Sequence, residues 1–274
     1  GVYDVFGRLV ARHIMKYIPG EPNVIVSPMP GAGGVTASNF IYNVAPKDGT
    51  ALGIVSAALK VMETIPGARY EAQKYNWIGR ILSTSNVTFT RGEGRVRNLD
   101  EARQRSSKIG ATAIGNALSF YTRALNITGG TKFEMIHGYV DAAAGILALE
   151  RGEVDGVTFS WNSLKNMRPQ WLADKSANII VQYAPVRHSQ LADIPTAIEV
   201  SRTAEDKALM EVFMASAETG ISIKAPPGVP SENVETLRRG FAAMMKDAAF
   251  REDAAKLESD FDPIDGWELQ KIVE

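Results

Sequence analysis

Residues 132–160 read KFEMIHGYVDAAAGILALERGEVDGVTFS, and this stretch holds the pattern that decides the fold. Residues 132–137 and 154–160 predict two strands, while residues 141–151 have the apolar spacing of a helix. A strand, a helix and a second strand in succession are typical of parallel sheets whose faces are covered by helices. The stretch therefore predicts an α/β fold.

The same alternation continues on both sides of this stretch. Further strands are predicted at residues 24–26, 51–55, 108–113, 178–183 and 220–225. Further helices are predicted at residues 3–17, 35–43, 118–126, 162–173, 203–215, 232–246 and 249–258. Asn98, Ser231 and Asp265 precede helical stretches, and their short polar side chains suit the capping position at a helix start.

The length of the chain favours two lobes. A single core rarely grows beyond about 250 residues, and this chain has 274. The order of strands favours a first lobe made of residues 1–107 and 221–274, and a second made of residues 108–220. Because a helix follows Gly1 directly, we expect a strand and an export signal upstream of it.

Composition excludes several classes of function. The chain has 30 Lys and Arg residues against 31 Asp and Glu, so it lacks the basic surface that binding to nucleic acid requires. It has no Cys, which excludes disulfides, thiolate metal sites and a Cys nucleophile. No run approaches 18 apolar residues, so we expect no segment that spans a membrane.

Three loops between a predicted strand and a predicted helix are rich in small residues: 30–34, 110–117 and 138–142. Glycine lets the backbone approach a ligand, and the free N–H groups of a helix start favour an anion. Loop 30–34 has neither the Walker nor the dinucleotide spacing, and by itself it is equally compatible with a tight turn. Three such loops at the carboxyl ends of parallel strands together predict a ligand cleft.

Residues suited to catalysis are few. Of the three histidines, His13 lies on a predicted helix, and only His137 ends a strand near the expected cleft. Asp4, Asp141 and Asp155 could act as acids or bases, but capping and turn roles explain them better. Trp161 is better explained by core packing than by ligand stacking. The sequence therefore predicts no catalytic residue, no metal and no cofactor.

Several short motifs in a fixed order carry a resemblance to a known family. They are residues 3–13 (YDVFGRLVARH), 18–22 (IPGEP), 29–34 (MPGAGG), 43–50 (NVAPKDGT), 151–156 (RGEVDG), 191–196 (LADIPT), 225–230 (APPGVP) and 245–250 (MKDAAF). This order resembles that of the Bug-type, TctC-like solute-binding proteins of tripartite tricarboxylate transporters, over essentially the whole chain.

The resemblance implies a two-lobed α/β periplasmic binding protein of type II, with a mostly parallel sheet in each lobe and two crossing strands. It implies a periplasmic protein that holds a small carboxylate between its lobes and delivers it to membrane transporter subunits. We expect a monomer that binds the carboxylate largely through backbone amides, small hydroxyls and water.

The resemblance also suggests ligand-binding residues. They are Tyr3, Asp4, Gly31, Ala32, Gly33, Ser56 and Ala57 in the first lobe, and Gly115, Asn116, Ala117, Tyr139 and Asp141 in the second. Asp155 matches a family motif for which we expect a structural role near the hinge. Asp141 departs from the family, which usually has a small residue there. Asp141 either caps its own helix or faces the cleft, where it would repel a second carboxylate.

Two alternatives remain at this point. An enzyme can use the same two-lobed fold, and Asp4, Asp141 and His137 are the residues that could serve it. A ligand sensor that docks on a membrane signalling receptor would show the same loops.

Overall fold

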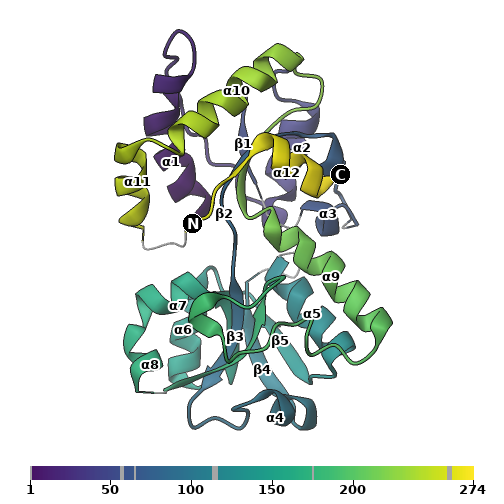
Figure 1. Cartoon of the computed structure of the whole chain (residues 1–274). Helices are drawn as coiled ribbons and strands as arrows, with labels where there is room; N and C mark the ends of the chain where they lie inside the picture. Colours follow the sequence, from purple (N-terminus) through teal and green to yellow (C-terminus); the bar gives the residue numbers. More distant parts are fainter. Residues whose placement is uncertain (1, 56–58, 65, 113–116, 175, 258–260) are drawn as a thin grey trace. The chain divides into compact units, whose positions relative to one another are not determined.

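The computed structural model describes residues 2–55, 59–64, 66–112, 117–174, 176–257 and 261–274. The chain forms two compact units (Figure 1). Unit 1 comprises Gly1–Ser83 and Thr219–Glu274, and unit 2 comprises Thr84–Glu218. The two-lobed α/β fold predicted from the sequence is therefore confirmed.

The first division between the units differs from the expected one. Residues 84–107, which we expected in the first lobe, lie in unit 2. The reason is β3 (Asn86–Arg91), which pairs with β6 on one side and β7 on the other. Neither β3 nor β2 (Asn76–Leu82) was among the predicted strands, and between them they carry the chain from unit 1 to unit 2.

Unit 1 has a four-stranded sheet in the order β1-β8-β2-β9. Its strands are β1 (Gly53–Ile54), β2, β8 (Ile221–Ala225) and β9 (Ile264–Asp265). Its helices are α1 (Val2–Ile14), α2 (Val35–Asn43), α3 (Leu59–Met62), α10 (Ser231–Met244), α11 (Ala248–Ala255) and α12 (Gly266–Val273). Short 3-10 turns are η1 (Met15–Tyr17), η2 (Ala32–Gly34) and η3 (Ala72–Lys74).

The pairs in this sheet are antiparallel, which corrects the prediction of a mostly parallel sheet in unit 1. The chain leaves unit 1 after Ser83 and returns at Thr219. Leu82 and Ile221, which lie next to these two points, pair with each other. The strand that leaves and the strand that returns must therefore run in opposite directions. At the return, a Cβ on Gly220 would lie 2.0 Å from the carbonyl oxygen of Leu82, so this position requires glycine.

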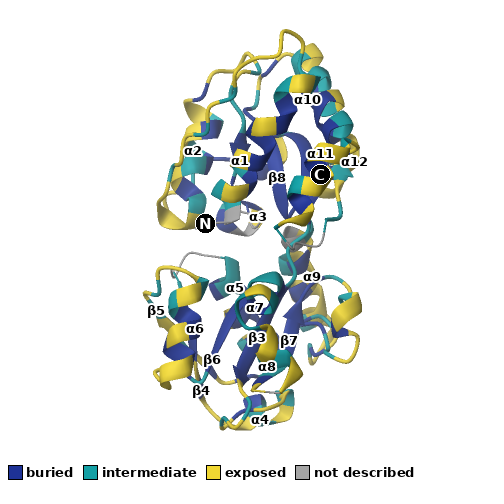
Figure 2. Ribbon diagram, turned by 90° about the vertical axis from the view of Figure 1, so that its left-hand side faces the viewer, coloured by how far each residue is buried: buried dark blue, intermediate teal, exposed yellow. Residues whose placement is uncertain are grey.

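The core of unit 1 joins the sheet to α1, α10 and α11. Phe6, Leu9, Ile223 and Phe241 are among the side chains buried there. On the other side α2 packs against β1, since a Cβ on Gly53 would lie 2.9 Å from the side chain of Ile41. Figure 2 shows β8 in dark blue, and the helices around it have outward sides in yellow.

Unit 2 has a five-stranded sheet in the order β5-β4-β6-β3-β7. Its strands are β3, β4 (Ser107–Ala111), β5 (Phe133–His137), β6 (Gly156–Ser160) and β7 (Ala177–Tyr183). Its helices are α4 (Leu99–Gln104), α5 (Ala117–Gly129), α6 (Ala142–Arg151), α7 (Trp161–Met167), α8 (Pro169–Ala173) and α9 (Ala204–Glu218), with a 3-10 turn η4 (Ser189–Leu191).

The sheet of unit 2 is mixed. β5, β4 and β6 are parallel as predicted, whereas β3 runs antiparallel to both of its neighbours. Apolar side chains of α5 and α9 fill the core on one face, and those of α6, α7 and α8 fill it on the other (Figure 1). The parallel part therefore has the helix-covered form that residues 132–160 predict.

Two of the three predicted helix caps are confirmed. The side chains of Asn98 and Asp265 accept backbone N–H groups at the starts of α4 and α12. Ser231 is the first residue of α10 and not its cap, which is Pro230. The single helix predicted at 162–173 is interrupted before Pro169, whose ring cannot continue a helix.

Residues 24–26 do not form the predicted strand. Ile25 is 82% exposed, and none of the three residues pairs with a described strand. Pro22, Pro28 and Pro30 flank the run, and proline donates no hydrogen bond to a strand ladder. Elsewhere, no helix in the described ranges is long and apolar enough to cross a bilayer.

Candidate functional site

The carboxyl ends of the parallel strands of unit 2 lie at one edge of the sheet. Ala111 and His137, the last residues of β4 and β5, pair with each other, so these two strands end together. Val157 of β6 pairs with Gly110, and β6 continues in the same direction to Ser160. The connections that follow lead into α5, α6 and α7. Ligands of open α/β sheets bind at such an edge, because helix starts and loop amides converge there. We call this set of connections the loop edge of unit 2.

His137 and Ser119 form a pair at the loop edge. The Nε2 atom of His137 lies 3.3 Å from the Oγ atom of Ser119, in the first turn of α5. Burial lowers the pKa of His137, and the nearby charge of Arg123 lowers it further. The pair therefore presents a neutral imidazole near pH 7. The sequence pointed to His137, but Ser119 was missed because a serine inside a helix gives no signal by itself.

Tyr139 has a packing role. Its ring covers Gly110, since a Cβ at that position would lie 3.1 Å from the ring. Its N–H donates to the carbonyl of Ala111 at 3.3 Å. Burial raises the pKa of its phenol. Tyr139 thus fixes the path of the connection between β5 and α6, which lies at the loop edge as predicted.

Asp141 caps α6. Its Oδ1 atom accepts the N–H of Ala144 at 2.9 Å, and its backbone is extended as a capping residue requires. The capping interpretation of Asp141 is therefore confirmed. The same carboxylate places a negative charge beside the helix start, where a ligand anion would otherwise find free N–H groups.

Asn162 is a polar residue at the loop edge that the sequence interpretation missed. It is the second residue of α7, directly after β6, and its Oδ1 atom is buried and accepts no hydrogen bond. A polar side chain just after a buried strand is the signal that could have revealed it. Its neighbour Trp161 is 4% exposed and donates to Gln190, so the core role expected for Trp161 is confirmed.

In unit 1, the loop before α2 has an unusual backbone. Gly31, Ala32, Gly33 and Gly34 all have positive φ angles, of 138°, 46°, 66° and 107°. A Cβ on Gly31 would lie 2.6 Å from the Oγ1 atom of Thr36, so that residue must be glycine. The first turn of α2 has no side-chain cap and no acidic residue. The N–H groups of Gly34 and Val35 donate within this turn, to the carbonyls of Gly31 and Ala32. What the turn offers an anion is the partial positive charge of the helix start, and a ligand at loop 30–34 stays a prediction.

Tyr3 and Asp4 lie within the first turns of α1 and not in a loop. Arg8 donates to the Oδ2 atom of Asp4 at 3.0 Å, and this bond lowers the pKa of the carboxyl. The Oδ1 atom is buried and accepts no hydrogen bond. A half-satisfied carboxylate can accept a bond from a ligand hydroxyl or ammonium group.

Four of the expected ligand residues, Ser56, Ala57, Gly115 and Asn116, lie outside the described residues. Val55 directly precedes the first two in the chain, and Ala117, the first residue of α5, follows the other two.

Asp155 has the predicted structural role but not the predicted place. Its Oδ2 atom accepts the N–H of Lys108 at 2.8 Å, and its own N–H donates to the carbonyl of Lys108. These bonds join the starts of β4 and β6, at the edge opposite the loop edge. The crossing at Ser83 precedes β3, whose first residue Asn86 pairs with Ser160 at the loop edge. Asp155 therefore lies at the end of unit 2 opposite the point where the chain enters it after Ser83.

The described residues offer little for catalysis. Ser119 is fully buried, and no carboxylate among them orients His137, so this pair lacks the third member of a nucleophilic triad. No group of three His, Asp or Glu residues in the described ranges could hold a metal. Uncapped amides, small residues and isolated polar atoms are typical of a binding site.

Comparisons with known proteins agree with this arrangement. The sequence matches the profile of the tripartite tricarboxylate transporter family receptor over residues 7–273. A comparison with curated protein sequences finds no match. A TctC solute-binding protein from Polaromonas has a similar fold, with a TM-score of 0.70 and 19% identity over 100% of this chain and 90% of that one.

Two further solved structures are similar. For the periplasmic binding protein BugD, the TM-score is 0.69 and the identity 19%, over 100% of this chain and 89% of that one. For MatC from Rhodopseudomonas palustris with bound malate, the TM-score is 0.67 and the identity is 16%, over 99% of this chain and 92% of that one. These likenesses show the fold. Because the family profile covers nearly the whole chain, this protein belongs to the receptor family of tripartite tricarboxylate transporters, a family of solute-binding proteins and not of enzymes.

Proposed function

We propose that this receptor binds a small carboxylate in the periplasm and delivers it, as a monomer, to a membrane transporter of the tripartite tricarboxylate type. The candidate ligand groups are the loop before α2 and the start of α1 in unit 1, and the loop edge in unit 2. The receptor holds its ligand without chemical change.

The loop before α2 is the observation that carries this proposal. Four consecutive residues with positive φ angles lead into a nine-residue helix that has no side-chain cap. A helix start without an acidic cap carries a partial positive charge, so it favours an anion. Gly31 and Gly33 lack side chains that would keep a carboxylate away from this helix start. The absence of acidic residues in the first turn removes the usual internal competitor.

The bound malate of MatC supports a carboxylate as the ligand class. Malate has two carboxylates and one hydroxyl. In this receptor, helix amides of unit 1 suit a carboxylate, and the free Oδ1 atom of Asp4 suits a hydroxyl. Asp141 places a negative charge in unit 2, which disfavours a long second carboxylate near α6. We therefore propose a monocarboxylate or a short hydroxy-dicarboxylate.

Native mass spectrometry of the purified protein, followed by thermal unfolding with acetate, lactate, malate, adipate, citrate and benzoate, tests the proposal. A ligand at a hundred times its dissociation constant should stabilise the fold by about 2.7 kcal/mol. The same mixtures are then analysed for products. A melting temperature that no carboxylate raises would contradict the proposal, and conversion of the bound carboxylate would favour the enzyme alternative.

A further inference from the structure

A groove runs along one side of α9 in unit 2. It has a volume of about 610 Å³ and lies between α9 and the two stretches 185–187 and 196–199, which follow β7 in the chain. All of its lining residues belong to unit 2, and Glu218, at the end of α9, is the last residue before the chain returns to unit 1. We call this feature the α9 groove.

Part of the lining of the α9 groove is apolar. Met214 is fully buried, Ile198 is half-buried, and Ala215 is exposed beside them. In the opposite wall, the side chain of Val186 is 75% exposed. An apolar side chain of a partner that enters the groove would therefore remove apolar surface from water, which favours association.

The charges of the two walls differ in how they are satisfied. In the wall that follows β7, Arg187 and Glu199 pair at 2.9 Å, and Glu199 also accepts the N–H of Thr196 at 2.7 Å. In the wall that α9 forms, Lys207 and Glu211 have no ion pair and no side-chain hydrogen bond with any described residue. The α9 wall thus has charges that a partner can pair.

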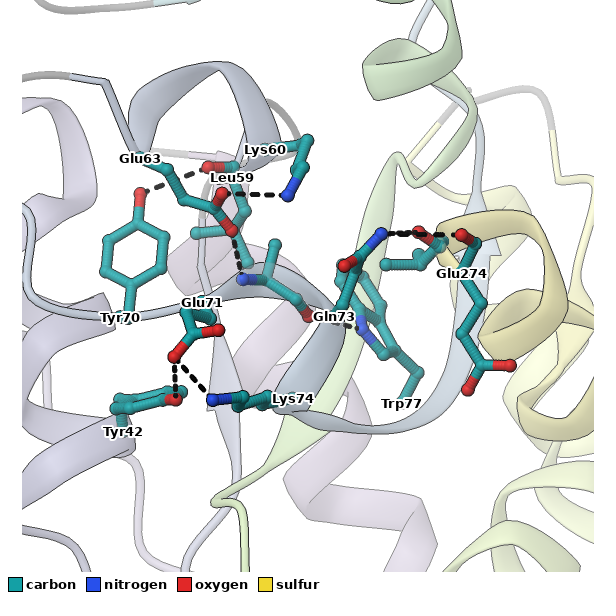
Figure 3. Close-up of polar contacts among 12 residues, drawn as sticks. Tyr42, Leu59, Lys60, Glu63, Tyr70, Glu71, Gln73, Lys74, Trp77 and Glu274 are labelled. Carbon is teal, nitrogen blue, oxygen red and sulfur yellow. Dashed lines mark hydrogen bonds and ion pairs between the residues drawn. The ribbon is translucent and has the colours of Figure 1, made fainter.

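Exposed charges at a similar spacing do pair in unit 1. Glu71 and Lys74, three residues apart, form an ion pair at 2.6 Å (Figure 3). Lys207 and Glu211 are four residues apart in a helix, where oppositely charged side chains can also reach each other. Because they do not pair, both side chains extend over the groove independently.

The α9 wall is acidic on balance. Glu211 and Glu218 are seven residues apart on one face of the helix, which places them about 10 Å apart along its axis. Glu205 and Asp206 add two acids in the first turn, and Lys207 is the one base of α9. The complement of this wall is a segment with an apolar side chain between two Lys or Arg side chains about 10 Å apart.

We propose that the α9 groove is the surface on which the membrane transporter docks, through a segment of this kind. This proposal rests on the proposed function, because delivery of the carboxylate requires a membrane partner. The groove ends at Glu218, directly before the chain crosses to unit 1 at Thr219. A segment seated in the groove thus lies beside the connection that any movement between the two units must bend, which suits a partner that takes over the carboxylate.

Co-sedimentation of the full chain with phosphatidylcholine vesicles tests the proposal. One set of vesicles contains the purified membrane subunits of the transporter, and the other set contains no protein. Docking is measured with and without malate, in about 50 and 300 mM NaCl. We expect docking to the first set only, with an affinity that falls several-fold at the higher salt concentration, because salt screens charges at the rim of an interface.

Two variants in the groove have matched controls outside it. Glu211→Lys reverses a charge of the groove, and Glu205→Lys makes the same change in the first turn of α9. Val186→Arg places a large cation in the groove, and Val212→Arg places it at a valine of α9 that is 60% exposed and does not line the groove. The two groove variants should lower the affinity for the loaded vesicles about tenfold, and the controls by less than about twofold. All four should bind carboxylates in calorimetry as the wild type does.

The outcomes separate this proposal from the proposed function. Equal losses in a groove variant and its control would overturn the groove as the docking surface and leave the proposed function intact. Docking to protein-free vesicles would also overturn it and identify lipid as the partner, and a dimer lost in Val186→Arg would identify a second copy. A receptor that binds a carboxylate but docks on neither set of vesicles would overturn both the groove and the delivery step. Docking that depends on Glu211 in a chain that binds no carboxylate would support the groove and contradict the proposed function.

Discussion

The two units satisfy their polar groups in different ways. In unit 1 the start of α2 has no side-chain cap, and the buried Lys224 has only two long bonds to carbonyls. In unit 2 the start of α6 is capped by Asp141. The buried hydroxyls of Thr88, Thr158 and Tyr183 in unit 2 bond to one another at 2.7 and 2.9 Å.

This difference has a consequence for an anion. Unit 1 keeps the partial positive charge of a helix start without a side-chain cap and a buried amine with only two long hydrogen bonds, so an anion can add what is missing there. Unit 2 satisfies most of its polar groups internally and offers small, directional contacts such as His137 and Asn162. Unit 1 should therefore supply most of the affinity for a carboxylate, and unit 2 most of the discrimination between carboxylates.

The largest expected effect concerns the stability of unit 1. Replacement of Lys224 by Met removes a buried amine whose pKa is lowered to about 7 from 10.5. Between pH 7 and pH 10.5 the unfolded chain binds a proton that the folded chain lacks, so the wild-type stability rises through this range. Lys224→Met should thus be more stable than wild type by a few kcal/mol at pH 6.5.

The advantage of Lys224→Met should shrink steadily from pH 7 toward pH 10.5. Urea unfolding of both proteins at pH 6.5, 8 and 9.5 measures it. The difference between the two proteins removes the contribution of other groups that titrate in this range. A stability difference between the two proteins that stays constant at all three pH values would show that folding does not change the pKa of the Lys224 amine. The contrast between the two units would then rest on the start of α2 alone.

The next effect concerns the polar network of unit 2. Thr158→Val removes a hydroxyl that contacts Thr88 at 2.7 Å and accepts from Thr122 at 3.1 Å. We expect a loss of about 2 kcal/mol, because buried hydroxyls lose a partner. Thr236→Val, which removes a hydroxyl on the exposed side of α10, should change stability by less than about 0.5 kcal/mol. Equal losses in the free energy of unfolding of the two variants, measured in urea, would mean that the buried network contributes no more to stability than an exposed hydroxyl does.

Much of the fold could be predicted because its signals are local. The cap residues Asn98 and Asp265 each depend on neighbours within one helical turn. The break at Pro169 has an equally local cause, but the prediction of a single helix at 162–173 missed it. The direction of β8 could not be predicted in this way. It depends on where the chain leaves and re-enters unit 1, and the sequence pattern contains no record of that crossing. The same limit explains why residues 84–107 were expected in the wrong lobe.

The site shows the same division. Loop 30–34 could be predicted because positive φ angles require glycine, and glycine is visible in a sequence. Ser119 and Asn162 could not, because their significance depends on packing between distant elements. Lys224 is an extreme case, since nothing in the run Ile221–Ala225 shows that its lysine is buried against Trp77.

A smaller effect should follow from a charge placed in the loop of unit 1. Ala32 is exposed and has a φ angle of 46°, a conformation that Asn and Asp adopt more readily than Ala. Ala32→Asp adds a negative charge beside the start of α2 and should weaken carboxylate binding about tenfold, which is about 1.4 kcal/mol. Ala32→Asn has the same shape and no charge, so it should bind as the wild type does in calorimetry. If both variants bind alike, the anion does not lie at this loop.

The smallest effect should come from the cap of α6 in unit 2. Asp141→Ala removes the bond to Ala144 and should cost about 1 kcal/mol of stability. Asp141→Asn keeps a good cap without the charge, so it should cost only a few tenths of a kcal/mol. If the carboxylate of Asp141 also limits the choice of ligand, both variants should bind adipate or citrate a few times more tightly than the wild type.

The pair Asp141→Ala and Asp141→Asn separates the two roles because only one variant loses the cap, whereas both lose the charge. A gain in affinity shared by both variants, with a loss of stability in Asp141→Ala alone, would assign capping to the bond with Ala144 and discrimination to the charge. Unchanged affinity for every carboxylate in calorimetry would reduce Asp141 to a cap. His137 and Asn162, two described polar residues of the loop edge that cap no helix, would then be the next candidates for discrimination.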